Sequence, residues 1–512
     1  MKPDPIKNLN YIIPQWIAGR YNKYAHVAIM YNTLCGEAFF FDEDSADVIG
    51  TILSYNIGDE VDIANISNIH NIAISSIIAF FEELVTNYLL VNKGLTDSEI
   101  LVLRHNIFMS RGNVLSSKKG VSLPSYFDTA ENDYRKIICE QGIPMSVILE
   151  LTYHCNQKCI HCYNQGAARG NINETHRDTD EMDLDTYYCL IDDLCNLGVA
   201  KLTLTGGDPF CKKEFWQILD YAHKKKFAID IYTNGLALYQ GDELKKLLKF
   251  YPRSVGLSVY SALSEVHESI TRVKNSLIKT LTIANQLSEA GVALYFKCPI
   301  MTINAQSYHT VATLAAKYNA VPQFDVNLTA AMDGDVSITN HLRLKENALN
   351  IILRDPLQPL YVGMNTPNGG KKLLSLKESL CGAGTDMASI TPFGEVYPCN
   401  SFPMPCGNVK KETFVEIWKN STQLKSFRKI TYEDCEQCGR NERCYFCNRC
   451  VGQSYIESKT PLKSSTDNCF ISNVRMNIGK DLNYMKGICQ IDVRKELQKI
   501  ELITSIDFNK EF

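Results

Sequence analysis

Three cysteines within eight residues constrain this chain more than any other feature. Cys155, Cys159 and Cys162 stand in the stretch CNQKCIHC, directly after the apolar, β-branched run SVILELT at residues 146–152. A short apolar run of this kind predicts a buried strand, so the thiols are expected in the loop at its end. A [4Fe-4S] cluster accepts three close thiolates from one loop and leaves one iron without a protein ligand.

A zinc site is the alternative, because His154 and His161 flank the thiols and could complete four ligands. Structural zinc, however, usually pairs two short ligand hairpins, and no second hairpin lies near CNQKCIHC in the sequence. The spacing therefore favours an iron-sulfur cluster with one reactive iron.

Composition limits the setting of such a cluster. The chain has 512 residues, 45% of them hydrophobic, which is enough for about two to four domains. Its formal charge of -4, from 53 basic and 57 acidic residues, favours neither nucleic acid nor an anionic membrane as a partner. Proline and aspartate interrupt the N-terminal MKPDPIKNLNYIIPQW, and no later run reaches about 18 apolar residues. We therefore expect a cytoplasmic protein, whose 19 cysteines serve metal binding rather than disulfides.

Four regions are expected along the chain. Residues 1–100 hold two strand-like runs around Cys35 and Gly36, then runs with helical apolar spacing, which predicts a small strand-plus-helix module. Residues 101–140 are mixed and polar, and we expect a linker that need not be uniquely ordered. Residues 141–355 form the third region, and residues 356–512, with most of the remaining cysteines, form the fourth.

Residues 141–355 alternate strand-like runs with amphipathic ones. The strand-like runs are SVILELT, KLTLTGG, FAIDIYTNG, SVGLSVYS, ALYFKCPI and QFDVNLT. Repeated β-α units predict parallel strands with right-handed crossovers, hence an α/β barrel or a doubly wound sheet. In both folds the functional residues lie at the carboxyl ends of the strands, which is where the three thiols stand.

Gly206 and Gly207 end the second of these runs, in TLTGGDPF. Consecutive glycines let a small ligand approach the backbone, whose carbonyl oxygens can accept hydrogen bonds from an ammonium group. A tight strand-to-helix turn would use the same residues. Beside the cysteine loop, a binding site is favoured.

The spacing of CNQKCIHC after the first strand, together with GGDP, resembles the radical S-adenosylmethionine (SAM) enzymes. The resemblance implies a partial (β/α)6 barrel, a [4Fe-4S] cluster held by Cys155, Cys159 and Cys162, and SAM chelated by the open iron through its amino and carboxylate groups. Enzymes of this family cleave SAM to methionine and a 5'-deoxyadenosyl radical.

The resemblance also implies residues that contact SAM. GGDP matches the segment that holds the methionine amino group, although the family more often has glutamate where this chain has aspartate. TNG at residues 233–235 and SVYS at residues 258–261 lie where later strands contact the carboxylate and ribose. The residues expected at the SAM site are Gly206, Gly207, Asp208, Ser258 and Tyr260, and for the last two ordinary packing inside the barrel is an equal alternative.

The fourth region contains a second array of thiols. CGAGTDMASITPFGEVYPC places two cysteines around a hairpin signal at Gly394, and CEQCGRNERCYFCNRC adds five more. Eight thiols could bind two further four-thiolate clusters, and a pair of zinc ribbons is the structural alternative. The eight are Cys381, Cys399, Cys435, Cys438, Cys444, Cys447, Cys450 and Cys469.

This array resembles SPASM, the auxiliary-cluster extension of radical SAM enzymes that modify peptides and proteins. By that likeness Cys435, Cys438, Cys444 and Cys469 would hold a distal [4Fe-4S] cluster, and Cys381 and Cys399 with Cys447 or Cys450 a proximal one. The family commonly has one cysteine where this chain has both Cys447 and Cys450, so the proximal cluster is either fully ligated by protein or keeps an open iron for a substrate thiolate. Cys406 is a further candidate ligand.

The remaining cysteines stand singly and are expected to be small buried hydrophobes. Cys298, on the fifth strand-like run, is the exception, because a thiol that faced into the barrel could donate a hydrogen atom.

The order of strands then helices in the first region resembles the precursor-peptide recognition element of ribosomal peptide biosynthesis. In that family a winged-helix fold adds the leader peptide as an extra strand at its sheet edge. A winged helix that binds DNA is the alternative, but DEDSADVIG and GDEVDIANIS are acidic and would repel DNA.

Together these resemblances predict a peptide maturase that uses SAM, one radical-generating [4Fe-4S] cluster and two auxiliary [4Fe-4S] clusters, with electrons from a flavodoxin or ferredoxin. We expect it to crosslink a precursor peptide that carries a leader sequence, and we favour a cysteine thioether over a carbon-carbon bond. Formylglycine formation on a sulfatase is the alternative hypothesis for an enzyme. A zinc-ribbon adaptor and an electron carrier are the alternatives that are not enzymes.

Overall fold

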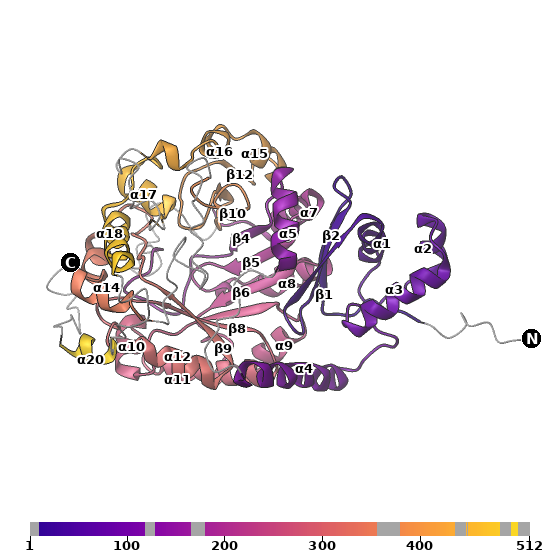
Figure 1. Cartoon of the computed structure of the whole chain (residues 1–512), viewed down its shortest axis with the longest axis horizontal. Helices are drawn as coiled ribbons and strands as arrows, with labels where there is room; N and C mark the ends of the chain where they lie inside the picture. Colours follow the sequence, from indigo (N-terminus) through magenta and orange to yellow (C-terminus); the bar gives the residue numbers. More distant parts are fainter. Residues whose placement is uncertain are drawn as a thin grey trace, which may run out of the picture.

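The computed structural model describes residues 10–117, 129–164, 180–355, 379–435, 447, 449–481 and 493–499, with the backbone alone of 108–117 and 493–494. Figure 1 shows the first helices and strands at one side of the molecule, parallel strands at its centre, and the last helices at the opposite side.

A three-stranded antiparallel sheet in the order β1-β2-β3 opens the N-terminal module. The hairpin expected at Cys35 and Gly36 joins β2 to β3. The sequence gives no strand signal for β1, because Gly19 and Arg20 interrupt its apolar pattern. The elements are β1 (Ile17–Asn22), β2 (Val27–Asn32), β3 (Glu37–Asp42), α1 (Glu43–Ser54), α2 (Ile63–His70) and α3 (Ile74–Thr86).

The segment 101–140, expected to be a linker that need not be uniquely ordered, contains helical structure. It includes most of α4 (Asp97–Ser117) and all of α5 (Thr129–Glu140). Tyr134 and Ile138 stand one helical turn apart on α5 and are fully buried in one cluster with Ile29 and Tyr31 of β2. The sheet therefore stabilises α5, whose own apolar stripe is too narrow to be recognised in the sequence.

Six parallel strands in the order β4-β5-β6-β7-β8-β9 form the central partial barrel, which confirms the expected α/β fold class. In the described residues β4 and β9 are not paired with each other, so the barrel is open between them. The strands are β4 (Ser146–Glu150), β5 (Lys201–Thr205), β6 (Ala228–Thr233), β7 (Ser254–Ser258), β8 (Leu294–Pro299) and β9 (Ala320–Asp325).

Helices follow these strands, and most of them bury their apolar faces against the outside of the sheet in one continuous core. They are α7 (Leu184–Leu197), η3 (Pro209–Cys211), α8 (Phe215–Lys224), α9 (Glu243–Leu248), α10 (Ser264–Thr271), α11 (Ser276–Glu289), α12 (His309–Lys317), α13 (Ser337–Leu342) and α14 (Glu346–Ile352).

Side chains of β8 alternate between this core and the barrel interior. Leu294, Phe296 and Cys298 lie in the core, whereas Lys297 lines an interior cavity. Cys298 is 1% exposed and faces the helices, so the idea of an inward-facing thiol that donates a hydrogen atom is wrong.

The C-terminal region extends the same sheet. β10 pairs in parallel with β4, so that Ser389 lies opposite Ile148, and β11 and β12 continue the sheet antiparallel. β4 is thus an interior strand, with β5 on one side and β10 on the other. The elements are β10 (Met387–Ile390), β11 (Glu395–Tyr397), β12 (Gly407–Asn408), α15 (Phe414–Asn420), α16 (Thr422–Phe427), η4 (Tyr432–Asp434), α17 (Val451–Ser458), α18 (Thr466–Lys480) and α20 (Val493–Gln498).

The N-terminal module docks on the amino ends of the barrel strands. The N–H of Gly19 donates to Lys226 O at 2.9 Å, two residues before β6 begins. The guanidinium of Arg20 donates to Lys225 O at 2.8 Å and lies 3.9 Å above the Phe227 ring. Because the cysteine loop follows the carboxyl end of β4, the module and the thiols stand at opposite ends of the barrel.

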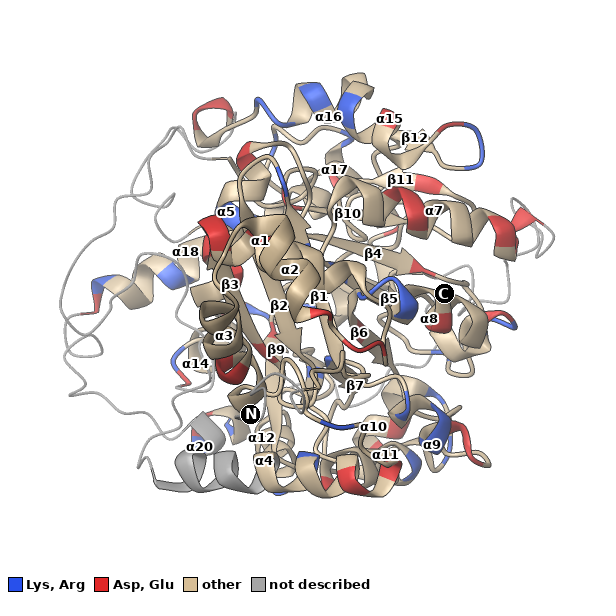
Figure 2. Cartoon of the chain, turned by 90° about the vertical axis from the view of Figure 1, so that its right-hand side faces the viewer, with Lys and Arg blue, Asp and Glu red and all other residues tan. Residues whose placement is uncertain are grey.

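Two features of the module bear on its partners. Its helices α1, α2 and α3 contain no lysine or arginine, and Figure 2, which views the molecule from this side, shows no basic band across them. No single helix in the described part of the chain is long and apolar enough to cross a membrane; α2 and α3 meet that criterion only as a pair bent by 118°.

Replacing Arg20 with methionine should loosen the module from the barrel, because the carbonyl oxygens of Gly19, Lys225 and Lys226 lose their charged donor. We expect a cost of about 2 kcal/mol. Thermal unfolding of R20M compared with K23M, which removes an exposed cation from the same module, measures this cost. Equal unfolding temperatures for the two variants would contradict the docking role.

Candidate functional site

The three thiols of CNQKCIHC lie together in the loop after β4. Burial raises the pKa of Cys155 to about 12 and that of Cys162 to about 11, and charge on either thiol further raises the pKa of Cys159. Charges act on one another in this way over roughly 4–6 Å. Buried, neighbouring thiols ionise only when a positive charge stabilises their thiolates. Iron supplies such a charge, so these thiols suit an iron-sulfur cluster.

A single zinc ion fits the described residues less well. Within them, no three His, Cys, Asp or Glu side chains converge closely enough to hold one metal ion. Burial lowers the pKa of His161 to about 4, and its ring packs edge-on against Tyr260 with centroids 4.9 Å apart. A cluster binds each thiolate to a different iron, so its ligands stand farther apart than those of one zinc ion.

Gly206 and Gly207 pack against the backbone of the cysteine loop. A Cβ atom would lie 2.2 Å from Thr152 O at Gly206, which has φ +139°, and 2.3 Å from His154 O at Gly207. The N–H of Gly207 donates to Thr152 O at 2.7 Å, so the two loops are joined directly. Among the described residues the carbonyl oxygens of both glycines accept no hydrogen bond, which leaves them available to an ammonium group.

Asp208 holds the neighbouring loops together. Its carboxylate accepts from Thr233 Oγ1 at 2.6 Å and from the N–H of Asn234 at 3.0 Å, in the TNG segment, and the side chain is closed to solvent. Burial raises the pKa of this carboxyl. Asn234 in turn donates to Asn156 Oδ1 at 2.7 Å, in the cysteine loop. Asp208 therefore positions the segments around the thiols rather than facing a ligand.

Tyr260 and Ser258 line a cavity of about 250 Å³ inside the barrel. The Tyr260 hydroxyl lies 3.9 Å from Cys159 Sγ, which places the cavity beside the cysteine loop. Lys297 supplies a cation to the lining, and its ammonium lies 3.6 Å above the Tyr232 ring. The cavity is lined by His161, Tyr163, Ser258, Tyr260, Lys297, Pro299, Asn327, Leu328 and Thr329.

The auxiliary cysteines separate into two groups. Burial raises the pKa of Cys399 to about 12 and that of Cys381 to about 11, and charge on Cys450 raises both further. Burial also raises the pKa of Cys447, which responds instead to charge on Cys435 and Cys469. We call Cys381, Cys399 and Cys450 the proximal thiols, and Cys435, Cys447 and Cys469 the distal thiols. Cys438 and Cys444 lie outside the described residues.

Backbone contacts explain this division. Gly452, two residues after Cys450, packs so tightly against the segment after Cys399 that a Cβ would lie 2.0 Å from Ser401 O. The N–H of Gly384 donates to Pro398 O at 2.9 Å, which ties the segment of Cys381 to the residue before Cys399.

Helix α18 holds two of the distal thiols near each other. Its Ser472 hydrogen-bonds Cys447, and Cys469 lies one turn earlier on the same helix. Cys406, the further candidate, has Ser421 and Arg428 as neighbours instead. Cys447 and Cys450, the two alternative ligands of the proximal cluster, thus belong to different groups.

Glu150 connects the two thiol systems, and the sequence analysis missed it. It ends β4, is 1% exposed, and accepts from the hydroxyls of Tyr163 at 2.7 Å and Tyr153 at 3.3 Å. Burial raises its pKa to about 7. Its charge acts on both Cys162 and Cys399. A lone acid inside the run SVILELT was the available signal.

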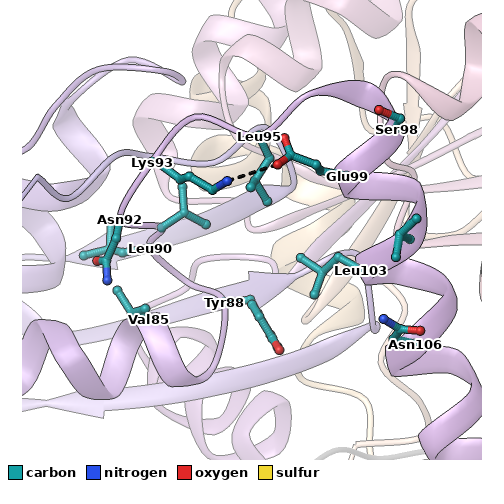
Figure 3. A pocket seen from close by; sticks show the side chains of 12 residues that line it. Val85, Tyr88, Leu90, Asn92, Lys93, Leu95, Ser98, Glu99, Leu103 and Asn106 are labelled. Atoms are coloured by element: carbon teal, nitrogen blue, oxygen red, sulfur yellow. Dashed lines mark hydrogen bonds and ion pairs between the residues drawn. The ribbon is translucent and has the colours of Figure 1, made fainter.

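A larger pocket, of about 560 Å³, lies in the N-terminal module (Figure 3). Apolar side chains such as Leu90, Leu95 and Leu103 line it, and its charged residues, Lys93 and Glu99, pair with each other at 3.0 Å. Its lining supplies no unpaired charge and no thiol, so we assign it no reaction.

Comparison with known proteins identifies both thiol systems. Residues 149–316 match the radical SAM superfamily, and residues 381–450 match SPASM, the iron-sulfur cluster-binding domain. The protein is a radical SAM enzyme with a SPASM domain. Its cofactors are accordingly a [4Fe-4S] cluster, SAM and auxiliary iron-sulfur clusters.

Several known proteins are similar to this radical SAM enzyme. The subtilosin biosynthesis protein AlbA of Bacillus subtilis is 29% identical, over 61% of this chain and 68% of its own. AdoMet-dependent heme synthase of Methanosarcina barkeri is 24% identical, over 62% and 94%. PqqA peptide cyclase of Methylobacterium nodulans is 25% identical, over 67% and 93%. The solved structure of anSMEcpe with bound AdoMet covers 68% of this chain and 100% of its own, with 17% identity and a TM-score of 0.51, which shows the common fold.

Replacing Cys155, Cys159 and Cys162 together with alanine should abolish reductive cleavage of SAM and leave iron in the SPASM region. Chromatography of 5'-deoxyadenosine and iron content per chain measure the two effects. Full cleavage of SAM by the triple variant would refute the role of these thiols.

Glu150 should make stability depend on pH. The folded protein holds this proton up to about pH 7, whereas the unfolded chain releases it near the ordinary glutamate pKa of 4.5. The folded state therefore binds more protons in this window, and the free energy of unfolding falls by about 3 kcal/mol as pH rises through it.

E150Q cannot ionise and should lack this loss. Its unfolding temperature relative to the wild type should increase between pH 5 and pH 7.5, as measured by scanning calorimetry. A difference that stays constant with pH would show that Glu150 has no raised pKa.

Proposed function

We propose that this enzyme matures a ribosomally made precursor peptide by forming a cysteine thioether. The observation that carries the proposal is the proximal group of three thiols, Cys381, Cys399 and Cys450, linked to the radical SAM loop through Glu150. Three thiolates leave one position of a [4Fe-4S] cluster without a protein ligand, and a substrate thiolate is a suitable fourth ligand. Similarity to AlbA and to PqqA peptide cyclase supports a peptide as substrate.

The residues of the barrel would hold the first cluster and SAM. Cys155, Cys159 and Cys162 would bind the cluster, and the carbonyls of Gly206 and Gly207 would accept from the amino group of SAM. When bound, these cofactors supply a 5'-deoxyadenosyl radical. Asp208 keeps the TNG segment in place, and Ser258 and Tyr260 present their hydroxyls to the cavity in which SAM and the reacting residue would meet.

The auxiliary thiols would hold the other clusters. The proximal thiols would bind the proximal cluster, and we therefore assign Cys450 rather than Cys447 to it. The distal thiols, with ligands from Cys438 and Cys444, would bind the distal cluster. Five cysteines then serve the distal site, one more than a four-thiolate cluster needs.

The bond change balances as an oxidation by two electrons. A substrate carbon gives one hydrogen atom to the deoxyadenosyl radical, and the substrate thiol loses its proton. A carbon-sulfur bond forms, and one electron passes to an auxiliary cluster. Glu150, whose burial raises its pKa to about 7, is a buried group between the two loops that can hold a proton at neutral pH. A flavodoxin or ferredoxin would supply the electron for SAM cleavage.

The N-terminal module would bind the leader. Within the described residues no strand pairs with the outer edge of β3, whose side chains are half-buried or exposed, so a peptide strand can add there. The module stands at the amino ends of the barrel strands, so the peptide has to run the length of a barrel strand to reach the thiols. A strand of six residues spans about 20 Å. The precursor therefore needs at least about six extended residues between the bound leader and the modified residue.

Mass spectrometry of a candidate precursor tests the function. The precursor encoded beside this gene is incubated anaerobically with the enzyme, SAM and a reductant, then alkylated. We expect a loss of two hydrogens per bond, with the crosslinked thiol no longer alkylated.

Other products would identify the alternatives. The same mass loss with all thiols alkylatable would indicate carbon-carbon crosslinking. Loss of sulfur from one cysteine would indicate formylglycine formation. Either result would contradict the thioether.

C450A should abolish crosslinking and lower the iron content by one cluster, because two proximal thiols remain. C189A, which removes an exposed thiol on α7, is the matched control and should keep both iron and activity. Iron analysis and peptide mass spectrometry measure the outcome. If C447A, and not C450A, eliminated the proximal cluster, the division of the thiols would be wrong.

A further inference from the structure

Arg449 is a buried cation that stands between the two auxiliary groups. It follows Cys447 of the distal thiols and precedes Cys450 of the proximal thiols in the sequence, and it is 4% exposed. One guanidinium nitrogen, Nη1, lies 3.1 Å from Cys435 Sγ, within hydrogen-bond distance of a thiolate sulfur. Arg449 therefore contacts one of the proposed cluster ligands directly.

The charge of Arg449 acts on both groups. Its guanidinium lies close enough to Cys381 of the proximal thiols and Cys447 of the distal thiols for its positive charge to act on both. A cation that favours thiolate over thiol also favours the more negative, reduced state of a cluster on those thiolates.

The remaining donors of Arg449 show that it is more than a packing residue. Nη2 donates to the carbonyl of Pro461, which orients the guanidinium. Nε is buried and has no hydrogen-bond partner among the described residues. A lysine or methionine could fill the same space, but a guanidinium held at Nη2 by the carbonyl of Pro461 keeps Nη1 directed at the sulfur of Cys435.

We propose that Arg449 raises the reduction potential of the distal cluster, so that the electron released during the reaction passes outward from the proximal cluster. Cluster potentials depend on net charge and on hydrogen bonds to sulfur, and Arg449 supplies both. One electron would leave the proximal cluster and reduce the distal cluster. An external electron-transfer protein would then reoxidise the distal cluster. This inference rests on the proposed ligand groups, but not on which bond the enzyme forms in its substrate.

The test is a redox titration of full-length enzyme followed by electron paramagnetic resonance, without SAM or precursor. Alanine at Cys155, Cys159 and Cys162 removes the first cluster's signal from all samples. In R449M we expect full iron content and at least a tenfold lower ratio of reduced to oxidised distal cluster at a fixed potential, which is about 59 mV for one electron. The proximal cluster should shift less.

Two further variants sharpen the result. R449K keeps the charge but loses the fork, and should shift the distal potential by a smaller amount in the same direction. R354M is the control, because Arg354 pairs with Asp481 at 2.9 Å, away from both thiol groups, and should leave the potentials unchanged.

Unchanged potentials in R449M at full iron content would overturn the proposal. If R449M lost iron, the test would pass to R449K. An unshifted distal potential in R449K, or the same loss of iron, would overturn the proposal, because Arg449 would then have a structural role only. Failure to find any thioether product would leave these potentials unaffected, so the two proposals can fail separately.

Discussion

The parallel pairing of β4 with β10 is the interaction on which the arrangement of thiols depends. β4 ends at Glu150 and leads into the cysteine loop, while β10 leads through the turn at Gly394 to Cys399. Because Ile390 lies opposite Leu149, the carboxyl ends of both strands reach the same edge of the sheet. One pair of neighbouring strands therefore joins the β10-β11 hairpin that precedes Cys399 directly to the strand that leads into the radical SAM loop.

Buried charged groups join what the strands bring together. Glu150 lies between the cysteine loop and Cys399, and Arg449 lies between the proximal and distal thiols. Each is almost closed to solvent, where a charge acts more strongly than in water. An acid near the cavity and a cation between the auxiliary groups suit the proposed reaction, which releases protons and electrons.

The sequence could predict the features that depend on local pattern. The cysteine loop, the six barrel strands and the glycine segment all follow from residues adjacent in the chain. Features that depend on tertiary pairing could not be predicted in this way. β10 is a short run that is a strand only because β4 lies beside it, and α5 depends on burial of Tyr134 and Ile138 against the N-terminal sheet.

The division of Cys447 from Cys450 has the same origin. The two are three residues apart, but Gly452 fixes Cys450 beside Ser401, and Ser472 holds Cys447 near Cys469. Spacing in the sequence cannot distinguish these contacts. Similarly, Gly206 and Gly207 are expected to let a ligand approach the backbone. In the structure, their missing side chains also let the backbone of this segment pack against that of the cysteine loop.

The proposed thioether chemistry requires the proximal cluster to leave an iron position for a substrate thiolate. X-ray absorption at the selenium edge, on anaerobic enzyme bound to a precursor whose reacting cysteine is replaced by selenocysteine, tests this most directly. We predict iron as a direct neighbour of selenium, lost in C450A. A spectrum with carbon as the only direct neighbour would contradict the account.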